Sequence, residues 1–307
     1  IYKTEKFKHI KFEEKLKIAN NNLNDLSLSG DFENQRFIFT SYLNDKLIRA
    51  DVYGLIDVIH EQPSFDINLY LKDVDLYGLN IIDKDKTMIF NSQIKANFQG
   101  IKIDEIYGNL IANNTSLYDS RGYYHMDSLS MSLTKNDFNS KNINLVCDFL
   151  DLDINGIVNI DKIDNSFKNY LLNHFHINKW TDRNIKLHDN HQDFYVNLVF
   201  KNTETLSRLL LPKLHISNNT NLTATFTSNN YMLNSTLVSE EITYNNIRFV
   251  DLNIKNKTSN KKTTATFQLD ELIFKDSTEN NPLKLSMENL NFLFDIHNDS
   301  ILFDFAW

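Results

Sequence analysis

The clearest candidate for metal chemistry in the sequence is the run His188-Asp189-Asn190-His191-Gln192-Asp193. Histidines three residues apart, with carboxylates nearby, can bind zinc when they share one face of a helix. Here the run stands directly before an alternating strand pattern, in which residues i and i+3 point to opposite faces. We therefore predict a surface turn, with no metal or catalytic role for His188, His191 or Asp193.

The remaining reactive residues give no catalytic pattern either. Cys147 is the single cysteine, so no disulfide can form within the chain and no cysteine-based metal site exists. It stands in an alternating apolar run, which predicts a small buried hydrophobe. The sequence contains no glycine-rich phosphate loop and no G-x-S-x-G nucleophile motif. Because the carboxylates stand at turns and alternate strand positions, we expect a chain that is not an enzyme and takes no cofactor.

Composition excludes several other classes of protein. The chain has 307 residues, a formal net charge of −8 and a pI near 5.6, which disfavours nucleic-acid binding. No window approaches 18 consecutive apolar residues, and no signal peptide follows Ile1. The chain starts without Met and stops at Trp307 within a strand pattern. We expect a piece of a longer protein, whose membrane anchor lies outside it.

Alternation of apolar and polar residues with a period of two dominates the sequence and predicts β-strands. Polar turns separate the alternating runs, which favours antiparallel hairpins, since parallel strands need crossover helices. The predicted turns are Asn44–Asp45, Asp83–Lys84–Asp85, Asn113–Asn114, Asn229–Asn230 and Ser259–Asn260. A change of phase at Leu150–Asp151 predicts a bulge or a strand end. The predicted fold is an all-β, mostly antiparallel sheet.

Only two windows have a helical pattern, residues 166–175 and 202–211, the second ended by Pro212. All seven glycines lie at or before Gly156, which suggests a boundary near residues 161–184. We expect an N-terminal β-segment over 1–162, a helix and linker over 163–184, and a C-terminal β-segment over 185–307, continuous with the first.

Each predicted strand has one apolar face, and two short helices cannot cover the apolar faces of so many strands. The apolar side must pack on another sheet, curl onto itself, or be covered by something outside the chain. Residues of one period-two set share a face, so parity selects a set of candidates for this apolar side. They are Phe65, Ile67, Leu69, Ile94, Phe98, Leu145, Phe149, Phe194, Leu198, Phe226, Phe267 and Phe292.

Several segments with a strand pattern resemble the repeating strands of the TamB family in the AsmA-like superfamily. They are Leu26–Phe32, Ser92–Gly100, Ile143–Gly156, Leu209–Phe226, Glu241–Ile254 and Asn298–Phe305. The scarcity of glycine after Gly156 departs from the glycine-rich strands of that family. The likeness consists of strand patterns spread over most of the chain, with no catalytic signature.

The resemblance implies a long, twisted sheet curled into a β-taco groove with an apolar interior, as in bridge-like lipid-transfer proteins. It implies a periplasmic location, an inner-membrane anchor outside this segment, and an outer-membrane barrel of the Omp85 type as partner. Phospholipid acyl chains would then cover the apolar side and pass between the two membranes. A scaffold or chaperone for assembly of outer-membrane barrel proteins, offering sheet edges to client strands, stays open as an alternative. So does a purely structural or adhesive β-segment.

Overall fold

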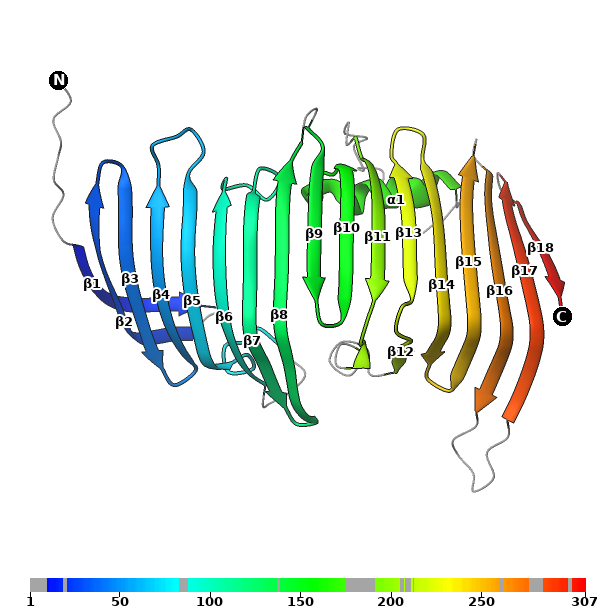
Figure 1. Cartoon of the computed structure of the whole chain (residues 1–307), viewed down its shortest axis with the longest axis horizontal. Coiled ribbons are helices and arrows are strands. Elements are labelled where there is room, and N and C mark those ends of the chain that lie inside the picture. Colours follow the sequence, from blue (N-terminus) through cyan, green and yellow to red (C-terminus); the bar gives the residue numbers. More distant parts are fainter. Residues whose placement is uncertain are drawn as a thin grey trace. The chain divides into compact units, whose positions relative to one another are not determined.

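The structure, a computed structural model, confirms an all-β fold with 71% strand (Figure 1). It describes residues 10–18, 21–82, 88–136, 139–174, 191–204, 207, 211, 213–259, 262–275, 284–297 and 300–307. The chain divides into two compact units. Unit 1 comprises 1–134 and 146–148, and unit 2 comprises 135–145 and 149–307. This division precedes the helix and linker that we predicted over 163–184.

Unit 1 is a meander of long strands in sequence order, and every ladder is antiparallel. Its strands are β1 (Ile10–Ile18), β2 (Asn21–Glu33), β3 (Arg36–Asp45), β4 (Ile48–Asp57), β5 (Ser64–Asp75), β6 (Ile89–Gln99), β7 (Tyr107–Asp119) and β8 (Gly122–Lys135). The strand β9 (Lys141–Cys147) has residues in both units. The turn predicted at Asn44–Asp45 lies two residues later, at Lys46–Leu47, because Asn44 and Asp45 still pair with Arg49 and Ile48. The turn predicted at Asp83–Asp85 lies outside the described residues.

The prediction of a turn at Asn113–Asn114 is wrong, because both residues lie inside β7. Asn114 has a φ of 50°, and the register between β6 and β7 shifts at this point. An asparagine tolerates this left-handed backbone in a bulge as well as in a turn. The bulge shifts the phase of the strand without ending it.

The start of β2 leaves the main sheet of unit 1. Its ladder with β3 begins only at Leu26, and residues 21–23 pair with the end of β1 alone. Asp25 has a φ of 57°, which allows the strand to turn there. In Figure 1, the end of β1 and the start of β2 run across the neighbouring strands instead of alongside them. We call β1 with residues 21–25 the arm of unit 1.

Unit 2 is also antiparallel in every ladder. Its first part contains β10 (Leu150–Ile157), the 3-10 helix η2 (Ile160–Lys162), α1 (Ile163–His174), β11 (Asp193–Phe200), β12 (Leu214–Ile216) and β13 (Asn221–Thr227). It continues with β14 (Met232–Tyr244), β15 (Ile247–Ser259), β16 (Lys262–Lys275), β17 (Lys284–His297) and β18 (Ser300–Ala306). The phase change at Leu150 is a strand end, because β9 stops at Cys147 and β10 starts at Leu150.

The helix predicted over 166–175 is confirmed as α1. In the second helical window, Glu204 and Ser207 are helical, and the Ser207 amide donates to the Thr203 carbonyl oxygen at 2.7 Å. Most other residues of that window lie outside the described residues. The turn at Asn229–Asn230 joins β13 to β14 as predicted, and Asn260 of the last predicted turn lies outside the described part.

Candidate apolar ligand-binding face

Strand register assigns the apolar residues of unit 1 to one side of its sheet. Phe65 pairs with Phe98, Ile67 with Ala96, and Leu69 with Ile94. Directly paired residues share a face, so these sets lie on one surface, which we call the apolar face of unit 1. Its larger members are Leu26, Leu28, Phe32, Phe37, Phe39, Leu43, Val52, Ile56, Phe65, Ile67, Leu69, Leu71, Ile94, Phe98, Leu110, Leu129, Met131 and Leu133.

This face carries no charge at the described ladder positions from Leu26 to Phe32 or at their cross-strand partners, and one carboxylate, Asp45, lies just beyond them at the end of β3, paired with Ile48. Its remaining members there are serine, alanine and glycine, such as Ser41 and Gly108. Gly108 has a φ of 145° and lies opposite Phe98, where an added Cβ would collide with the backbone of β6. Glycine is therefore required at this position. On the other side of β6, the Phe98 ring stacks on the Phe65 ring of β5 with centroids 4.8 Å apart.

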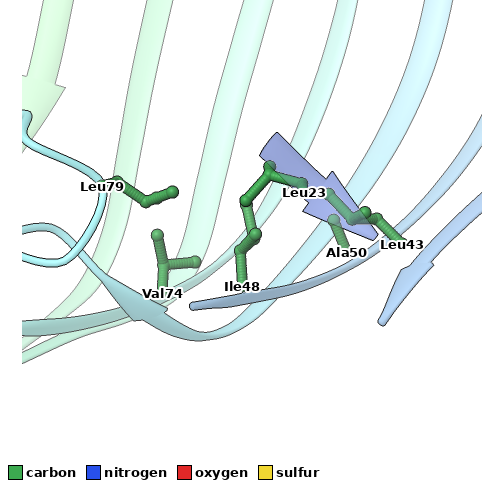
Figure 2. Close-up of a cluster of buried hydrophobic side chains, with 6 residues drawn as sticks. All are labelled: Leu23, Leu43, Ile48, Ala50, Val74 and Leu79. Atoms are coloured by element: carbon green, nitrogen blue, oxygen red, sulfur yellow. The ribbon is translucent and has the colours of Figure 1, made fainter. Parts of the chain in front are cut away.

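One end of the apolar face of unit 1 is closed by an aliphatic cluster (Figure 2). The arm supplies Leu23, which is 0% exposed, and the segment after β5 supplies Leu79. They pack against side chains of the sheet, and the six buried members are Leu23, Leu43, Ile48, Ala50, Val74 and Leu79. The described residues of unit 1 contain no helix. The sheet of unit 1 therefore curls onto its own apolar face at this end.

Unit 2 has a corresponding surface, the apolar face of unit 2. Leu198 pairs with Leu222, and Phe267 pairs with Phe292. Its larger members are Leu150, Leu152, Ile154, Phe194, Val196, Leu198, Phe200, Leu222, Phe226, Leu233, Leu237, Leu252, Ile254, Phe267, Leu269, Leu290, Phe292, Phe294, Ile296, Ile301, Phe303 and Phe305. The positions between them hold uncharged residues, including Ser235 and Asn256.

The middle of the apolar face of unit 2 is concave. Leu252, Leu269 and Leu290 are buried, and the side chains packed against them come from the same face, for example Phe249 and Phe305. A flat sheet would leave such residues open, so burial by neighbours of one face requires the sheet to bend toward that face. The ladders of β14 to β17 each lack a pair next to these positions while the register stays the same, as expected where a sheet bends.

The helix α1 covers one end of this face. Its Tyr170 packs on Phe226 with ring centroids 6.2 Å apart, and Phe226 is 3% exposed as a result. The Tyr170 hydroxyl and Thr258 Oγ1 are 3.1 Å apart. Thr258 donates to a backbone carbonyl, so Tyr170 donates to Thr258. The helix therefore rests on both an aromatic contact and a buried hydrogen bond.

His174 forms the second attachment of α1. Its Nε2 lies 2.8 Å from the Tyr231 carbonyl oxygen, and its Nδ1 lies 3.4 Å from Thr263 Oγ1. A carbonyl only accepts, so Nε2 carries a proton and donates to the Tyr231 carbonyl oxygen. The side chain is buried and both ring nitrogens have partners. This arrangement explains His174 as a structural residue.

The structure places ten of the twelve candidate residues on one of the two apolar faces. Nine of them are half-buried, and Phe226 is buried under α1. Leu145 lies in β9 and Phe149 in the bend before β10, where no register assigns a face; both are half-buried. The role of these residues in lining a lipid groove stays a prediction.

The histidine-rich run does not form a described metal site. His188 lies outside the described residues, and Asp193 starts β11, exposed, and accepts a hydrogen bond from Thr227 at 3.1 Å. Among the residues that the structure describes, no group of His, Cys, Asp and Glu side chains could hold a metal ion. In that same part of the chain, no helix is both long and apolar enough to cross a membrane. Cys147 is buried and forms no disulfide, as predicted.

Sequence reasoning missed two features of these faces. It predicted α1 but not its position over Phe226, and it did not foresee the arm that closes unit 1. The buried stripe Ser166, Tyr170 and His174 repeats every four residues and could have identified the contact side of the helix. Comparison of the chain with protein-family models, curated proteins and solved structures gives no match.

Proposed function

We propose that the chain is a non-enzymatic segment of a periplasm-spanning, bridge-like protein whose apolar faces conduct phospholipids between the inner and outer membranes. The observation that carries this proposal is the long apolar face of each unit, with an uninterrupted uncharged stretch over several successive strands. Large uncovered apolar surfaces mark binding sites, and the resemblance to TamB-like strands suggests acyl chains as the ligand. An anchor and the contact with an Omp85-type barrel belong to parts outside this segment.

The energetics of an acyl chain suit such a face. Burial contributes about 0.8 kcal/mol for each CH₂ group, so a lipid tail gains from contact with several successive strands. An unpaired charge in an apolar conduit is strongly unfavourable, so one charge placed midway should block passage. The uncharged stretch that each face shows over its described ladder positions, such as Phe65 to Leu71 on β5 and Phe194 to Phe200 on β11, fits this requirement.

The experiment uses a photo-crosslinking amino acid at paired neighbours on opposite faces of one strand. Phe98 and Leu198 lie on the apolar faces, and Asn97 and Asn197 are their outward-facing neighbours. In cells making the full-length protein, we expect phospholipid crosslinks from Phe98 and Leu198 only. A folded protein that gives no lipid crosslink from either apolar position would disprove the proposal. Mass spectrometry of co-purifying lipids would identify the bound class.

Blocking variants test conduction separately from binding. Leu69→Asp and Leu198→Asp, as two separate proteins, should stop lipid transfer, while Asn68→Asp and Asn197→Asp leave it unchanged. Circular dichroism checks that each variant is folded. If the Leu→Asp proteins unfold instead, the faces serve as an ordinary core.

A second candidate function is a scaffold for assembly of outer-membrane barrel proteins. The outer strand of unit 2, β18, favours it, because Ile301, Leu302 and Phe303 are exposed. An exposed apolar edge strand is a template for pairing with a client strand. Crosslinks from Leu302 to an unfolded barrel protein, with no lipid crosslinks from Phe98 or Leu198, would favour this function over lipid transport.

A further inference from the structure

The opposite, polar face of unit 1 carries three exposed tyrosines around one carboxylate. Tyr42 and Tyr70 are both cross-strand partners of Asp51, on β3 and β5, and Tyr53 follows Asp51 by two residues on β4. All four side chains therefore share one face, and the three tyrosines are 44%, 47% and 39% exposed in the order Tyr42, Tyr70, Tyr53. Aromatic rings thus surround Asp51 on three sides.

Neighbouring tyrosine rings in this cluster are nearly perpendicular to each other. The Tyr42 and Tyr53 ring centroids are 6.1 Å apart at 88°, and those of Tyr53 and Tyr70 are 6.3 Å apart at 85°. The Tyr42 and Tyr53 hydroxyls lie 3.5 Å from each other. This hydrogen bond is the main cause that raises the pKa of Tyr53, and the negative charge of Asp51 adds to it. Neutral rings with an adjacent anion are the surroundings that an organic cation prefers.

Asp51 is exposed, and among the described residues no cation pairs with it. The surface beside it is hollowed on two sides. One hollow, of about 500 Å³, is lined by Asp51, Tyr53, Asn68 and Tyr70. The other, of about 630 Å³, includes Tyr42, Asp51 and Tyr70 in its lining. A ligand at Asp51 would therefore sit in a shallow depression.

Two cations lie on the same face, two residues further along β4 and β5 from the pair Asp51 and Tyr70. Arg49 precedes Asp51 by two residues on β4, and its direct cross-strand partner is Lys72 on β5. Both line the larger hollow. Arg49 is paired with Asp73 through one nitrogen at 2.8 Å, while no ion pair is formed by Lys72 within the described part of the chain. Like charges directly opposite one another destabilise a ladder. An anion bound between Arg49 and Lys72 would relieve this repulsion and form charge-assisted hydrogen bonds with both side chains.

Alternate residues along a strand are about 6.6–6.8 Å apart, which fixes the distance between the anion and cation positions. A two-carbon linker joins the phosphate and the trimethylammonium group of phosphocholine over a comparable span. We propose that the Tyr42, Tyr53, Tyr70 and Asp51 cluster, with Arg49 and Lys72, binds the phosphocholine group. The trimethylammonium group lies against the rings and Asp51, and the phosphate lies between Arg49 and Lys72. This site is on the face opposite the apolar face and does not depend on lipid conduction.

The test titrates the intact chain with soluble phosphocholine, choline and inorganic phosphate, by calorimetry or by NMR of the tyrosine rings. Phosphocholine should bind more tightly than choline or phosphate alone, and phosphoethanolamine should bind more weakly than phosphocholine. Tyr70→Leu and Asp51→Asn should each weaken phosphocholine binding by roughly 2- to 5-fold, the effect of one exposed cation–π or ionic contact. Lys72→Gln should weaken phosphate and phosphocholine but leave choline unchanged.

Matched controls remove the same charges elsewhere on exposed polar positions. Asp304→Asn on β18 and Lys255→Gln on β15 should leave all three affinities unchanged. Vesicles of phosphatidylcholine, compared with phosphatidylglycerol, separate a lipid headgroup from a soluble ligand as the source. Equal binding of phosphocholine and phosphate, or unchanged binding in the Tyr70→Leu and Asp51→Asn proteins, would overturn the proposal. Lipid crosslinks at Phe98 would not be affected by that result.

Discussion

The two units cover one end of their apolar faces by different means. Unit 1 uses its own chain, because Leu23 of the arm and Leu79 enter an aliphatic cluster with no polar partner (Figure 2). Unit 2 uses a helix whose buried contact stripe is Ser166, Tyr170 and His174. Aliphatic burial is non-directional and scales with area, whereas a buried hydrogen bond stabilises only when both partners are in place. The closed end of unit 1 should therefore be the more stable of the two.

The largest expected effect comes from the aliphatic cluster. Leu23→Ala should lower the local free energy of unfolding of unit 1 by about 2–5 kcal/mol, since it leaves a cavity in a fully buried site. Hydrogen exchange of peptides from β2 to β4 measures this stability. Ile38→Ala, at an exposed position of β3, should change it by less than about 0.5 kcal/mol. If both variants behave alike, the arm does not close the apolar face in solution.

The next effect tests a feature that the units share. Gly108 and Gly156 lie opposite Phe98 and Phe194, with φ angles of 145° and 135°, and an added Cβ would collide with the partner strand at both sites. Gly108→Ala and Gly156→Ala should each destabilise their own unit by about 1–3 kcal/mol.

Gly122→Ala is the matched control, because its φ is 148° but an added Cβ would meet nothing within 4 Å. All three alanine variants carry the cost of a positive φ, so the extra loss of stability at Gly108 and Gly156 measures the collision of the added Cβ with the partner strand. Thermal unfolding of the three proteins measures it, and equal shifts would show that the close strand approach is absent.

The strands and the sides of most residues could be predicted from the sequence, because alternation is a local property. Phe65, Ile67 and Leu69 needed only their spacing to be placed together, and the register confirms it. The bulges were harder, since Asn114 carries the same local signal as a turn residue. The arm and the position of α1 depend on residues far apart in the chain, such as Leu23 and Val74, which share one buried cluster, and Tyr170 and Thr258, which share a hydrogen bond. No period or spacing contains that information.

A smaller effect is expected at the helix of unit 2. Tyr170→Phe keeps the aromatic contact with Phe226 and removes the hydrogen bond to Thr258, so it should weaken the attachment of α1 by about 0.5–1.5 kcal/mol. Hydrogen exchange of the α1 amides, compared with those of β17, measures this. Lys168→Gln on an exposed part of the same helix should change little. Equal protection of α1 in Tyr170→Phe and the unaltered protein would mean that packing alone holds the helix.

The smallest expected effect concerns the pH dependence of the arm of unit 1. Asp45 accepts hydrogen bonds from the backbone amides of Asn24 in the arm, at 3.0 Å, and of Leu47, at 2.9 Å. The bond from Asn24 is the main cause that lowers the pKa of Asp45 below its usual value of 3.8. A carboxyl with a lower pKa in the folded state stabilises that state above the unfolded pKa, and this contribution is lost as the pH falls through the folded pKa. The arm should therefore loosen as the pH drops below about 3.8, while the ladder between β3 and β4 stays closed.

Asp45→Asn keeps one acceptor oxygen but carries no charge, so its arm should lose this part of the pH dependence. Exchange rates of residues 21–25, corrected for the intrinsic effect of pH, give the comparison, and an identical acid response in both proteins would exclude Asp45 as the group that holds the arm.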